Sequence, residues 1–492
     1  MSADSLLPPP VAAAARPGTL PLCVDLDGTL IRSDMLEEGI AAAAGDPRLL
    51  AAMLRLAGGR AAFKQRIAAL AEMDPALLPY NEPLLALLRA HHAAGRQLVL
   101  ATAADRAVAE RIADHLGLFD AVIASDGANN MKGRAKAAAL VERFGPKGFA
   151  YAGNSASDLP IWREAGSAIV VNAPRAVAAR ARAAAPVEHE IDNRAGAMAL
   201  LRAMRPHQWV KNLLVFLPIL TAHAVGDLSA WTQAGLAFAA LCLTASAIYI
   251  INDILDVAAD RAHPHKRNRP FARGAARLSH GVLLSGALLC GGLALGLAAG
   301  ALWVVAVYAA MSVAYSVRLK QLPLVDVFML AGLYVIRIVA GGEATGHRLS
   351  LWLMGFSSFL FLGLALLKRV EELMAAGQGG QGGQIARRGY SPADVPILTA
   401  FGCGAAFSAT LVLALFVQSE ATAALYASPG LLWGSVPLML FWQCRMWLSA
   451  SRGYMHHDPI VYAARDRVSW AVGLALVVVL AAAKSTTLFA TW

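Results

Sequence analysis

The chain has 492 residues, of which 57% are hydrophobic and only 15% are charged, a balance that excludes an ordinary soluble globular protein. The formal net charge of +10 suits either nucleic acid or an anionic membrane surface, and the long apolar runs favour the membrane over nucleic acid. The cysteines are scattered singly, which excludes a disulfide framework or a zinc site with paired cysteines. Residues 1–18 lack the charged and apolar regions of a signal peptide, and we expect a flexible tail there.

Residues 19–190 alternate strand-length apolar runs with Ala-rich helical stretches, which is typical of an α/β domain with a parallel sheet. The runs are LPLCVDLDGTL, QLVLATAA, DAVIAS, FAYAGNS and SAIVVNA. A longer helical insert, at about 33–92, separates the first run from the second. We expect residues 191–204 to link this domain to the rest of the chain.

Asp25 and Asp27 follow the first apolar run, so we expect them at the end of a strand, where open α/β sheets bind their ligands. An aspartate at this place can attack phosphorus, and a second one two residues on can shuttle the proton. Taken alone, DLDGT is also compatible with a simple turn. It is followed, after later runs, by four more polar residues: Thr102, Lys132, Asn154 and Asp158.

The order and spacing of these residues resemble the four motifs of the haloacid dehalogenase superfamily of phosphatases. The resemblance implies a Rossmannoid fold with residues 33–92 as a helical cap. It implies that Asp25 is the nucleophile and Asp27 the acid and base. The implied phosphate-binding residues are Thr102 and Lys132, and the implied Mg²⁺ ligands are Asp25, Asp27, Asn154 and Asp158. Asn154 stands where this superfamily more often has aspartate, and its amide oxygen ligates Mg²⁺ with less charge.

From about residue 205 the pattern changes to long apolar segments, most of which approach the roughly 20 residues needed to cross a bilayer. We predict nine spans: 211–225, 231–254, 281–300, 301–316, 324–342, 350–367, 396–418, 429–448 and 468–484. Positive residues gather in the loops after the second, fourth, sixth and eighth segments. This asymmetry predicts a multi-pass protein of the cytoplasmic membrane, with the N-terminal domain in the cytoplasm and the C-terminus outside.

The second apolar segment ends in the stretch YIINDILDVAADRAHPHKRNRPFARG. Asn252, Asp256 and Asp260 are spaced i, i+4 and i+8, and Asp253 lies on the same face, so a helix would carry them as one polar stripe. Carboxylates in a row repel one another unless a cation lies between them, and Mg²⁺ is usually held by carboxylates together with substrate phosphate. The bases just beyond would bind the remaining phosphate oxygens; Lys266 and Arg269 are our candidates. The alternative is a solvated acidic helix end.

The stretch NDILDVAAD resembles the NDxxDxxxD motif of the UbiA superfamily of intramembrane prenyltransferases, and residues 205–492 carry further resemblances. The stretches RPHQWVKN, YSVRLKQLPLVDVF, VIRIVAGG, KRVEEL and DPIVYAARDR are similar to the branch of decaprenyl-phosphate phosphoribosyltransferases. Five of their residues are implied to bind substrate: Lys211, Lys320, Asp326, Arg337 and Lys368. The superfamily carries a second pair of aspartates where this chain has only Asp326, with Leu330 four residues later. This departure favours a diphosphate carried by a sugar over one carried by a prenyl chain.

Arg337 lies eleven residues after Asp326 within the fifth segment, close to three helical turns, so we expect both side chains to point the same way. A charged residue that deep usually faces a cavity. The alternative is an arginine whose head reaches the membrane interface.

These resemblances together imply an Mg²⁺-dependent bifunctional enzyme. Its all-α membrane domain would transfer 5-phosphoribose from phosphoribosyl diphosphate to a polyprenyl phosphate, and its α/β domain would remove the 5-phosphate from the product. Two alternatives stay open: a transferase that moves a prenyl group from prenyl diphosphate to an aromatic acceptor, and a non-enzymatic lipid-binding scaffold with a vestigial phosphatase. A homo-oligomer is also left open.

Overall fold

The computed structural model describes residues 20–43, 48–49, 59–70, 73–126, 130–194, 196–264, 266–378, 389–455 and 458–485. The predicted tail at 1–18 and part of the predicted cap lie outside these ranges. The chain forms two compact units. The first comprises Met1–Met204 and Tyr249–Leu284, and the second comprises Arg205–Ile248 and Ser285–Trp492. The segment that carries NDILDVAAD therefore packs with the N-terminal α/β domain.

The first unit is built on a six-stranded sheet in the order β3-β2-β1-β4-β5-β6, with every neighbouring pair parallel. The strands are β1 (Leu22–Val24), β2 (Leu98–Asp105), β3 (Ala121–Ser125), β4 (Ala150–Gly153), β5 (Ser167–Val171) and β6 (Val187–Ile191). The parallel α/β fold predicted for the N-terminal domain is thus confirmed. The sequence pattern did not reveal β6, because its residues VEHEI form no apolar run.

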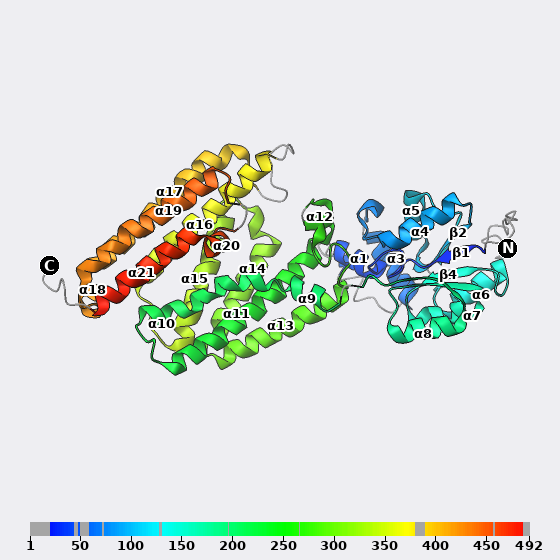
Figure 1. Cartoon of the computed structure of the whole chain (residues 1–492), viewed down its shortest axis with the longest axis horizontal. Helices are drawn as coiled ribbons and strands as arrows, with labels where there is room; N and C mark the ends of the chain where they lie inside the picture. Colours follow the sequence, from blue (N-terminus) through cyan, green and yellow to red (C-terminus); the bar gives the residue numbers. More distant parts are fainter. Residues whose placement is uncertain are drawn as a thin grey trace. The chain divides into compact units, whose positions relative to one another are not determined.

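Helices pack on both faces of the sheet (Figure 1). Successive residues of β1 serve opposite faces, as a strand requires: Leu22 and Val24 belong to one hydrophobic cluster and Cys23 to the other. One face carries α4 (Glu82–Ala93) and α5 (Arg106–Leu116), and the other carries α6 (Arg134–Phe144), α7 (Leu159–Glu164) and α8 (Arg175–Ala184).

The helical insert after β1 contributes α1 (Met35–Ala42), α3 (Gly59–Leu70) and the short 3₁₀ helix η2 (Pro75–Leu77). The last part of the predicted cap is α4, and its residues Leu84 and Leu88 are fully buried against the sheet. This helix therefore belongs to the layer that covers the sheet. The first unit also contains α9 (Met198–Ala203), α12 (Val257–Ala262) and two 3₁₀ helices, η3 (Ala156–Asp158) and η5 (Lys266–Asn268).

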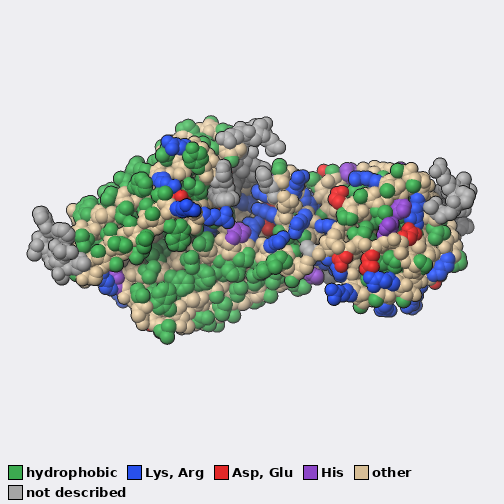
Figure 2. Space-filling model, viewed as in Figure 1, with side chains coloured by type: hydrophobic (Ala, Val, Ile, Leu, Met, Phe, Trp, Pro, Cys, Tyr) green, Lys and Arg blue, Asp and Glu red, His purple; other side chains and the backbone are tan. Residues whose placement is uncertain are grey.

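The second unit is helical, as predicted for a polytopic membrane domain. In the described residues six helices are long and apolar enough to cross a bilayer. They are α11 (Leu228–Leu255), α13 (Leu278–Ala298), α15 (Val325–Thr345), α16 (Leu351–Gln378), α17 (Val395–Val417) and α21 (Arg467–Ser485). The last residues of α11 and the first residues of α13 belong to the first unit. Large apolar side chains on their outer faces are exposed, such as Leu283, Leu297 and Leu474. Figure 2 shows hydrophobic side chains over much of the visible face of these helices. The chain is a multi-pass membrane protein.

The remaining three predicted spans correspond to shorter elements. The fourth is α14 (Leu302–Val317), and the eighth combines the 3₁₀ helix η8 (Pro429–Gly434) with α19 (Ser435–Ser451). The first is a 3₁₀ helix, η4 (Pro206–Phe216), followed by α10 (Leu217–Thr221). Pro206 and Pro218 lie in the first turns of these two pieces, where proline is tolerated but an earlier helix cannot continue unbroken. The number of spans stays a prediction. Shorter helical elements complete the unit: η6 (Leu319–Gln321), η7 (Pro392–Asp394), α18 (Glu420–Leu425) and α20 (Pro459–Arg465).

Candidate active sites

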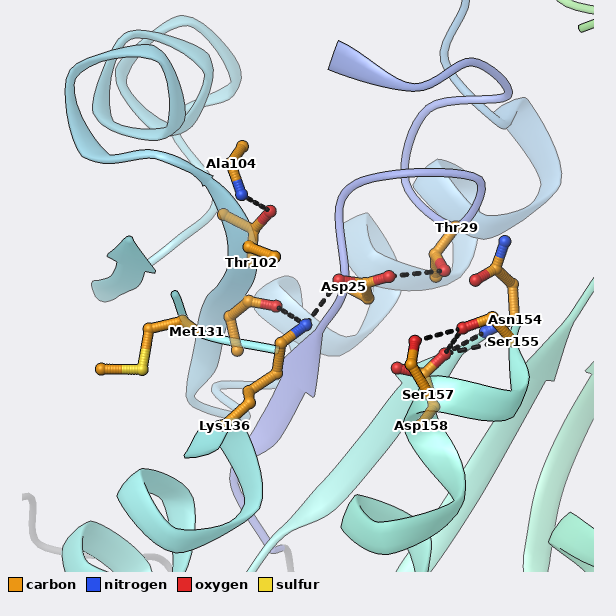
Figure 3. A network of polar contacts seen from close by, with 12 residues as sticks. Asp25, Thr29, Thr102, Ala104, Met131, Lys136, Asn154, Ser155, Ser157 and Asp158 are labelled. Carbon is orange, nitrogen blue, oxygen red and sulfur yellow. Dashed lines mark hydrogen bonds and ion pairs between the residues drawn. The ribbon is translucent and has the colours of Figure 1, made fainter. Parts of the chain in front are cut away.

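The first candidate site lies where β1 and β4 end, at the carboxyl edge of the sheet. A cavity of about 220 Å³ opens there, and Asp25 and Asp27 line it together with Asn154 and Asp158. The structure therefore brings together the four residues predicted to ligate Mg²⁺. Lys132 lines the same cavity. Thr102 is fully buried in β2 beside it, and its hydroxyl oxygen accepts a hydrogen bond from the Ala104 amide at 3.0 Å (Figure 3).

A lysine that the sequence analysis did not name makes the closest contact with Asp25. Lys136 is 2% exposed, and its Nζ lies 2.7 Å from Asp25 Oδ1, while it also donates to the carbonyl of Ala101 at 2.9 Å (Figure 3). The stretch MKGRAK contains two lysines four residues apart. Both lysines line the cavity, but only Lys136, on α6, contacts Asp25, and the sequence pattern did not locate the start of α6 at Arg134.

The environment of Asp25 makes its carboxylate costly to ionise. Burial raises the pKa of Asp25 to about 6, although the Lys136 ammonium opposes the shift. Its Oδ2 accepts a long hydrogen bond of 3.5 Å from the Thr29 hydroxyl, whereas Oδ1 lies 2.7 Å from Lys136 Nζ. Oδ2 is therefore the less tightly bound of the two oxygens.

The turn after β1 requires glycine. Gly28 has φ +72°, and a Cβ at this position would lie 2.1 Å from the side-chain nitrogen of Asn154. Asp27 is held on the same turn, because its Oδ1 accepts a hydrogen bond from the Met35 amide at 2.8 Å, at the start of α1. The glycine thus allows the two loops that carry Asp27 and Asn154 to approach each other.

The loop after β4 fixes Asp158 through several donors. Its Oδ2 accepts hydrogen bonds from the amides of Asn154 and Ser155 at 3.0 and 2.9 Å, and its Oδ1 accepts one from the hydroxyl of Tyr151 at 3.1 Å. Within the described ranges, no three acidic, His or Cys side chains converge as a ready metal cluster. The oxygen donors on this cavity nevertheless suit Mg²⁺, which is usually held by one or two carboxylates and completed by water and substrate phosphate.

The second candidate site is the NDILDVAAD stretch. The predicted single helical stripe is interrupted here, because α11 ends at Leu255 and Asp256 precedes α12. Asn252 and Asp253 therefore lie on one helix and Asp260 on the next. The backbone still follows a nearly helical path, since the Asp256 amide donates to the Asn252 carbonyl at 2.9 Å.

Arg269 joins two carboxylates of this stretch. Its Nη1 lies 3.1 Å from Asp253 Oδ1 and 2.6 Å from Asp260 Oδ2, and both aspartates are buried. We expected a cation between these carboxylates, and in this structure the guanidinium of Arg269 lies between Asp253 and Asp260. Lys266, the other predicted base, is exposed in η5.

A third polar cluster lies in the second unit around Asp458. Lys211 and Lys368, both predicted substrate-binding residues, donate to Asp458 Oδ2 at 2.7 and 2.9 Å. Burial would raise the pKa of Asp458, but Lys368 and Lys211 hold it below the usual range. Asp458, the first residue of the stretch DPIVYAARDR, was not predicted as a site residue, and it also caps α20 by accepting a hydrogen bond from the Ile460 amide at 3.2 Å. Two ammonium groups on one carboxylate leave this cluster with a net positive charge suited to an anion.

The structure does not join Asp326 to Arg337, although both side chains are buried. Asp326 Oδ2 accepts from Arg369 at 2.5 Å, and Tyr390 donates to its other oxygen. Arg337 donates to Asn212 Oδ1 at 2.7 Å and stacks on the ring of Tyr308, with its guanidinium carbon 4.9 Å from the centroid. Asp326 and Arg337 both lie on α15, but they contact different residues of neighbouring elements.

Lys320 lies half-buried in η6, close in sequence to the start of α15. Lys320 was also predicted to bind substrate, and it lies at the end of the YSVRLK stretch that suggested this role. Its role stays a prediction.

A parallel α/β domain with an aspartate pair, joined to a bundle of apolar helices, defines a membrane transferase fused to a hydrolase. The profile of the UbiA prenyltransferase family matches residues 213–453, and that of the haloacid dehalogenase-like hydrolases matches residues 22–163. The chain belongs to the UbiA prenyltransferase family and carries a haloacid dehalogenase-like domain at its N-terminus. Both resemblances drawn from the sequence are thus confirmed.

Similar proteins cover different parts of the chain. The uncharacterized protein y4nM of Sinorhizobium fredii is 38% identical over 467 residues, 92% of this chain and 89% of its own length. The nodulation protein NoeC of Azorhizobium caulinodans is 34% identical over 283 residues, 57% of this chain and 92% of its own. The decaprenyl-phosphate phosphoribosyltransferase of Mycolicibacterium smegmatis is 40% identical over 189 residues, 37% of this chain and 59% of its own.

Proposed function

We propose that this protein transfers 5-phosphoribose from phosphoribosyl diphosphate to a polyprenyl phosphate, and that its N-terminal domain then removes the 5-phosphate from the lipid-linked product. The observation that carries the transfer step is the state of Asp326. Asp326 stands where the superfamily carries its second pair of aspartates, and it is fully buried against Arg369. It is therefore a poor ligand for a second metal-bound diphosphate. That supports a donor whose diphosphate is handled by the NDILDVAAD stretch alone. The 40% identity to a phosphoribosyltransferase over 189 residues supports the same choice of donor.

In the transfer step an oxygen of the lipid phosphate attacks the anomeric carbon of the ribose, and the bond from that carbon to diphosphate breaks. Asp253, Asp256 and Asp260 would hold Mg²⁺ on the donor diphosphate, and Asn252 would bind the substrate. Magnesium there would neutralise the charge that develops on the leaving diphosphate. Arg269 and Lys266 would bind the remaining diphosphate oxygens. For this, Arg269 would leave Asp253 and Asp260 and bind the diphosphate instead.

In the second unit, the positive cluster around Asp458 would bind the anionic groups of donor or acceptor. Lys211 and Lys368 already lie side by side on one carboxylate oxygen, so a phosphate that displaces this carboxylate would find two ammonium groups in place. Arg337 and Lys320 are further candidates for substrate contact. The domain limits that we propose are 19–190 for the phosphatase, 191–204 for the linker and 205–492 for the membrane transferase.

In the phosphatase step Asp25 would attack the 5-phosphate, while Asp27 gives a proton to the leaving sugar oxygen. Asp27 would then take a proton from the water that hydrolyses the aspartyl phosphate. Lys136 keeps Asp25 oriented, and Lys132 and Thr102 would hold the phosphate. Asp25, Asp27, Asn154 and Asp158 would supply the oxygen ligands of the Mg²⁺ that this chemistry uses.

We place the protein in the cytoplasmic membrane, with the N-terminal domain in the cytoplasm and the C-terminus outside. The direct test of the proposed activity is incubation of the purified protein with radiolabelled phosphoribosyl diphosphate, polyprenyl phosphate and Mg²⁺. Label is expected in the lipid fraction as a pentose without its 5-phosphate. Label that stays in the water phase would contradict the transfer step, and a lipid that keeps the 5-phosphate would contradict the phosphatase step.

A further inference from the structure

The cavity at Asp25 extends beyond the groups that the hydrolysis of one phosphate requires. Its lining also includes Arg32, Ser33 and Arg277, and of these Arg32 and Ser33 come from the haloacid dehalogenase-like domain. A water needs roughly 10–15 Å³ of such space, so the 220 Å³ of this cavity exceeds what a single phosphate group fills. Room and positive charge therefore remain next to the reacting phosphate.

Two polar atoms at this end of the cavity are buried without a partner. Ser33 is 8% exposed, and its hydroxyl oxygen has no hydrogen-bond partner in the part of the chain that the structure describes; the same holds for Nε of Arg32. A buried donor without a partner costs free energy, and a ligand that supplies an acceptor removes this cost. Arg32 Nε can only donate and the Ser33 hydroxyl can donate as well as accept, so one acceptor such as a phosphate oxygen would satisfy both atoms.

The acids at this end are already engaged. Asp34 caps α1 by accepting a hydrogen bond from the Leu36 amide at 2.8 Å, and Glu37 accepts one from the Ser279 amide at 3.2 Å. Burial lowers the pKa of the Arg32 guanidinium and the nearby charge of Arg273 lowers it further, while the Glu82 carboxylate acts in the opposite direction without reversing the shift. This like-charge pair is a second sign that an anion fits beside Arg32.

Arg277 reaches this cavity from the loop that follows NDILDVAAD, and the loop is fixed on both sides of it. On one side, Gly274 has φ +66° and lies so close to the insert that a Cβ would come within 2.6 Å of Arg32 Cβ. On the other side is the hydrogen bond from the Ser279 amide to Glu37. Arg261 anchors the start of the loop through a buried ion pair with Glu38 at 2.7 Å. The backbone on both sides of Arg277 is thus held against the insert, while the Arg277 side chain itself is exposed and lines the cavity.

We propose that Ser33, Arg32 and Arg277 form a second anion subsite, which binds the phosphodiester of a 5-phosphoribosyl lipid while its 5-phosphate lies at Asp25. This inference rests on the proposed phosphatase function and names the feature of the substrate that the domain selects. A substrate with a single phosphate leaves the subsite empty. The loop of the transferase motif thereby contributes a specificity residue to the phosphatase.

Binding to the full chain in detergent with Mg²⁺ tests the subsite without turnover. The Asp25→Asn protein is titrated with two soluble probes, ribose 5-phosphate and ethyl 5-phosphoribosyl phosphate, which adds only the phosphodiester. We expect about tenfold tighter binding of the second probe, as for a charged hydrogen bond. Adding Arg277→Gln should remove most of this preference. The matched control is Arg180→Gln, which removes an exposed arginine on α8 and should keep it.

Equal affinity for the two probes, or a preference that survives Arg277→Gln, would overturn the subsite. Phosphate release from the ethyl probe by the unmodified protein is measured in parallel. A binding preference without phosphate release would contradict the proposed phosphatase function and leave the subsite standing. Phosphate release without a binding preference would contradict the subsite and leave the proposed phosphatase function standing.

Discussion

Arg261 binds both carboxylate oxygens of Glu38, at 2.8 and 2.7 Å, and both side chains are almost completely buried. The two residues are 223 positions apart in the chain. Glu38 lies on the first helix of the phosphatase insert, and Arg261 directly follows the last aspartate of NDILDVAAD. The pair therefore ties the proposed phosphatase to the segment that we propose handles the donor diphosphate.

The first prediction concerns the stability that this ion pair provides. Glu38→Gln would leave the Arg261 guanidinium buried without a counter-charge, and breaking one half of a buried pair typically costs about 3–5 kcal/mol. We expect a clear fall in the unfolding temperature of the purified protein. Glu142→Gln, on the exposed surface of α6, is the matched control and should change the temperature little. Equal unfolding temperatures for the two variants would show that the pair contributes nothing.

The second prediction distinguishes the two lysines of the phosphatase site. Lys136 contacts the proposed nucleophile directly, whereas Lys132 lines the cavity. Lys136→Met should therefore lower phosphate release more than Lys132→Met does. The expected loss for Lys136→Met is roughly 10²-fold, typical for removal of one electrostatic contact at a reacting group. The rate is read as released phosphate per minute, and a larger effect of Lys132→Met would reverse the assignment.

The third prediction concerns the metal of the transfer step. Asp256→Asn should abolish most transfer of labelled pentose to lipid. In the sequence Asp256 lies between Asp253 and Asp260, and it would complete the Mg²⁺ ligands that these two aspartates provide. The protein should still fold, since Asp256 is only partly buried. Undiminished transfer at an unchanged Mg²⁺ requirement would remove the motif from the mechanism.

The fourth prediction is a pH dependence of the stability of the first unit. Hydrogen bonds from Arg96 lower the pKa of Glu188 below its usual value of 4.5, although burial acts in the opposite direction. A carboxylate with a lowered pKa in the folded state stabilises the protein above its unfolded pKa, and this stability is lost as the pH falls through the folded pKa. Glu188→Gln should therefore destabilise at pH 7 and much less at acidic pH below 4. A difference in unfolding temperature that does not shrink on acidification would contradict this.

The fifth prediction concerns topology. Nine spans that start in the cytoplasm end outside it, so a reporter fused after Trp492 should be active outside the cytoplasm. The elements that decide the count are the 3₁₀ helix Pro206–Phe216 with α10, the short helix α14, and η8 with α19. A cytoplasmic reporter would mean that an odd number of these three does not cross.

Local patterns were sufficient for much of the fold. Strand-length apolar runs predicted β1 to β5, and Asp25 and Asp158 follow strands as expected, because the ends of parallel strands meet at one edge of a sheet. The edge strand β6 was missed, since its alternating charged residues lack an apolar run. Long apolar segments likewise predicted the helices of the membrane domain.

Contacts between distant residues could not be predicted in the same way. Asp458 is 247 positions from Lys211 and 90 from Lys368, so no local spacing reveals that the three share one cluster. Lys136 differs from Lys132 only by its place on a helix whose start the sequence did not define. The ion pair between Arg261 and Glu38 depends on packing of two segments whose own patterns do not indicate a partner.

The mass of the lipid product tests most directly whether the two domains act in sequence. Purified protein is incubated with phosphoribosyl diphosphate, polyprenyl phosphate and Mg²⁺, and the lipid is analysed by mass spectrometry for the unmodified protein and for Asp25→Asn. We predict that the unmodified protein yields a lipid-linked pentose without a 5-phosphate, and that Asp25→Asn accumulates the 5-phosphorylated lipid in similar total amount. If both proteins yield the same 5-phosphorylated lipid, the phosphatase serves another substrate and the proposed coupling of the two sites is wrong.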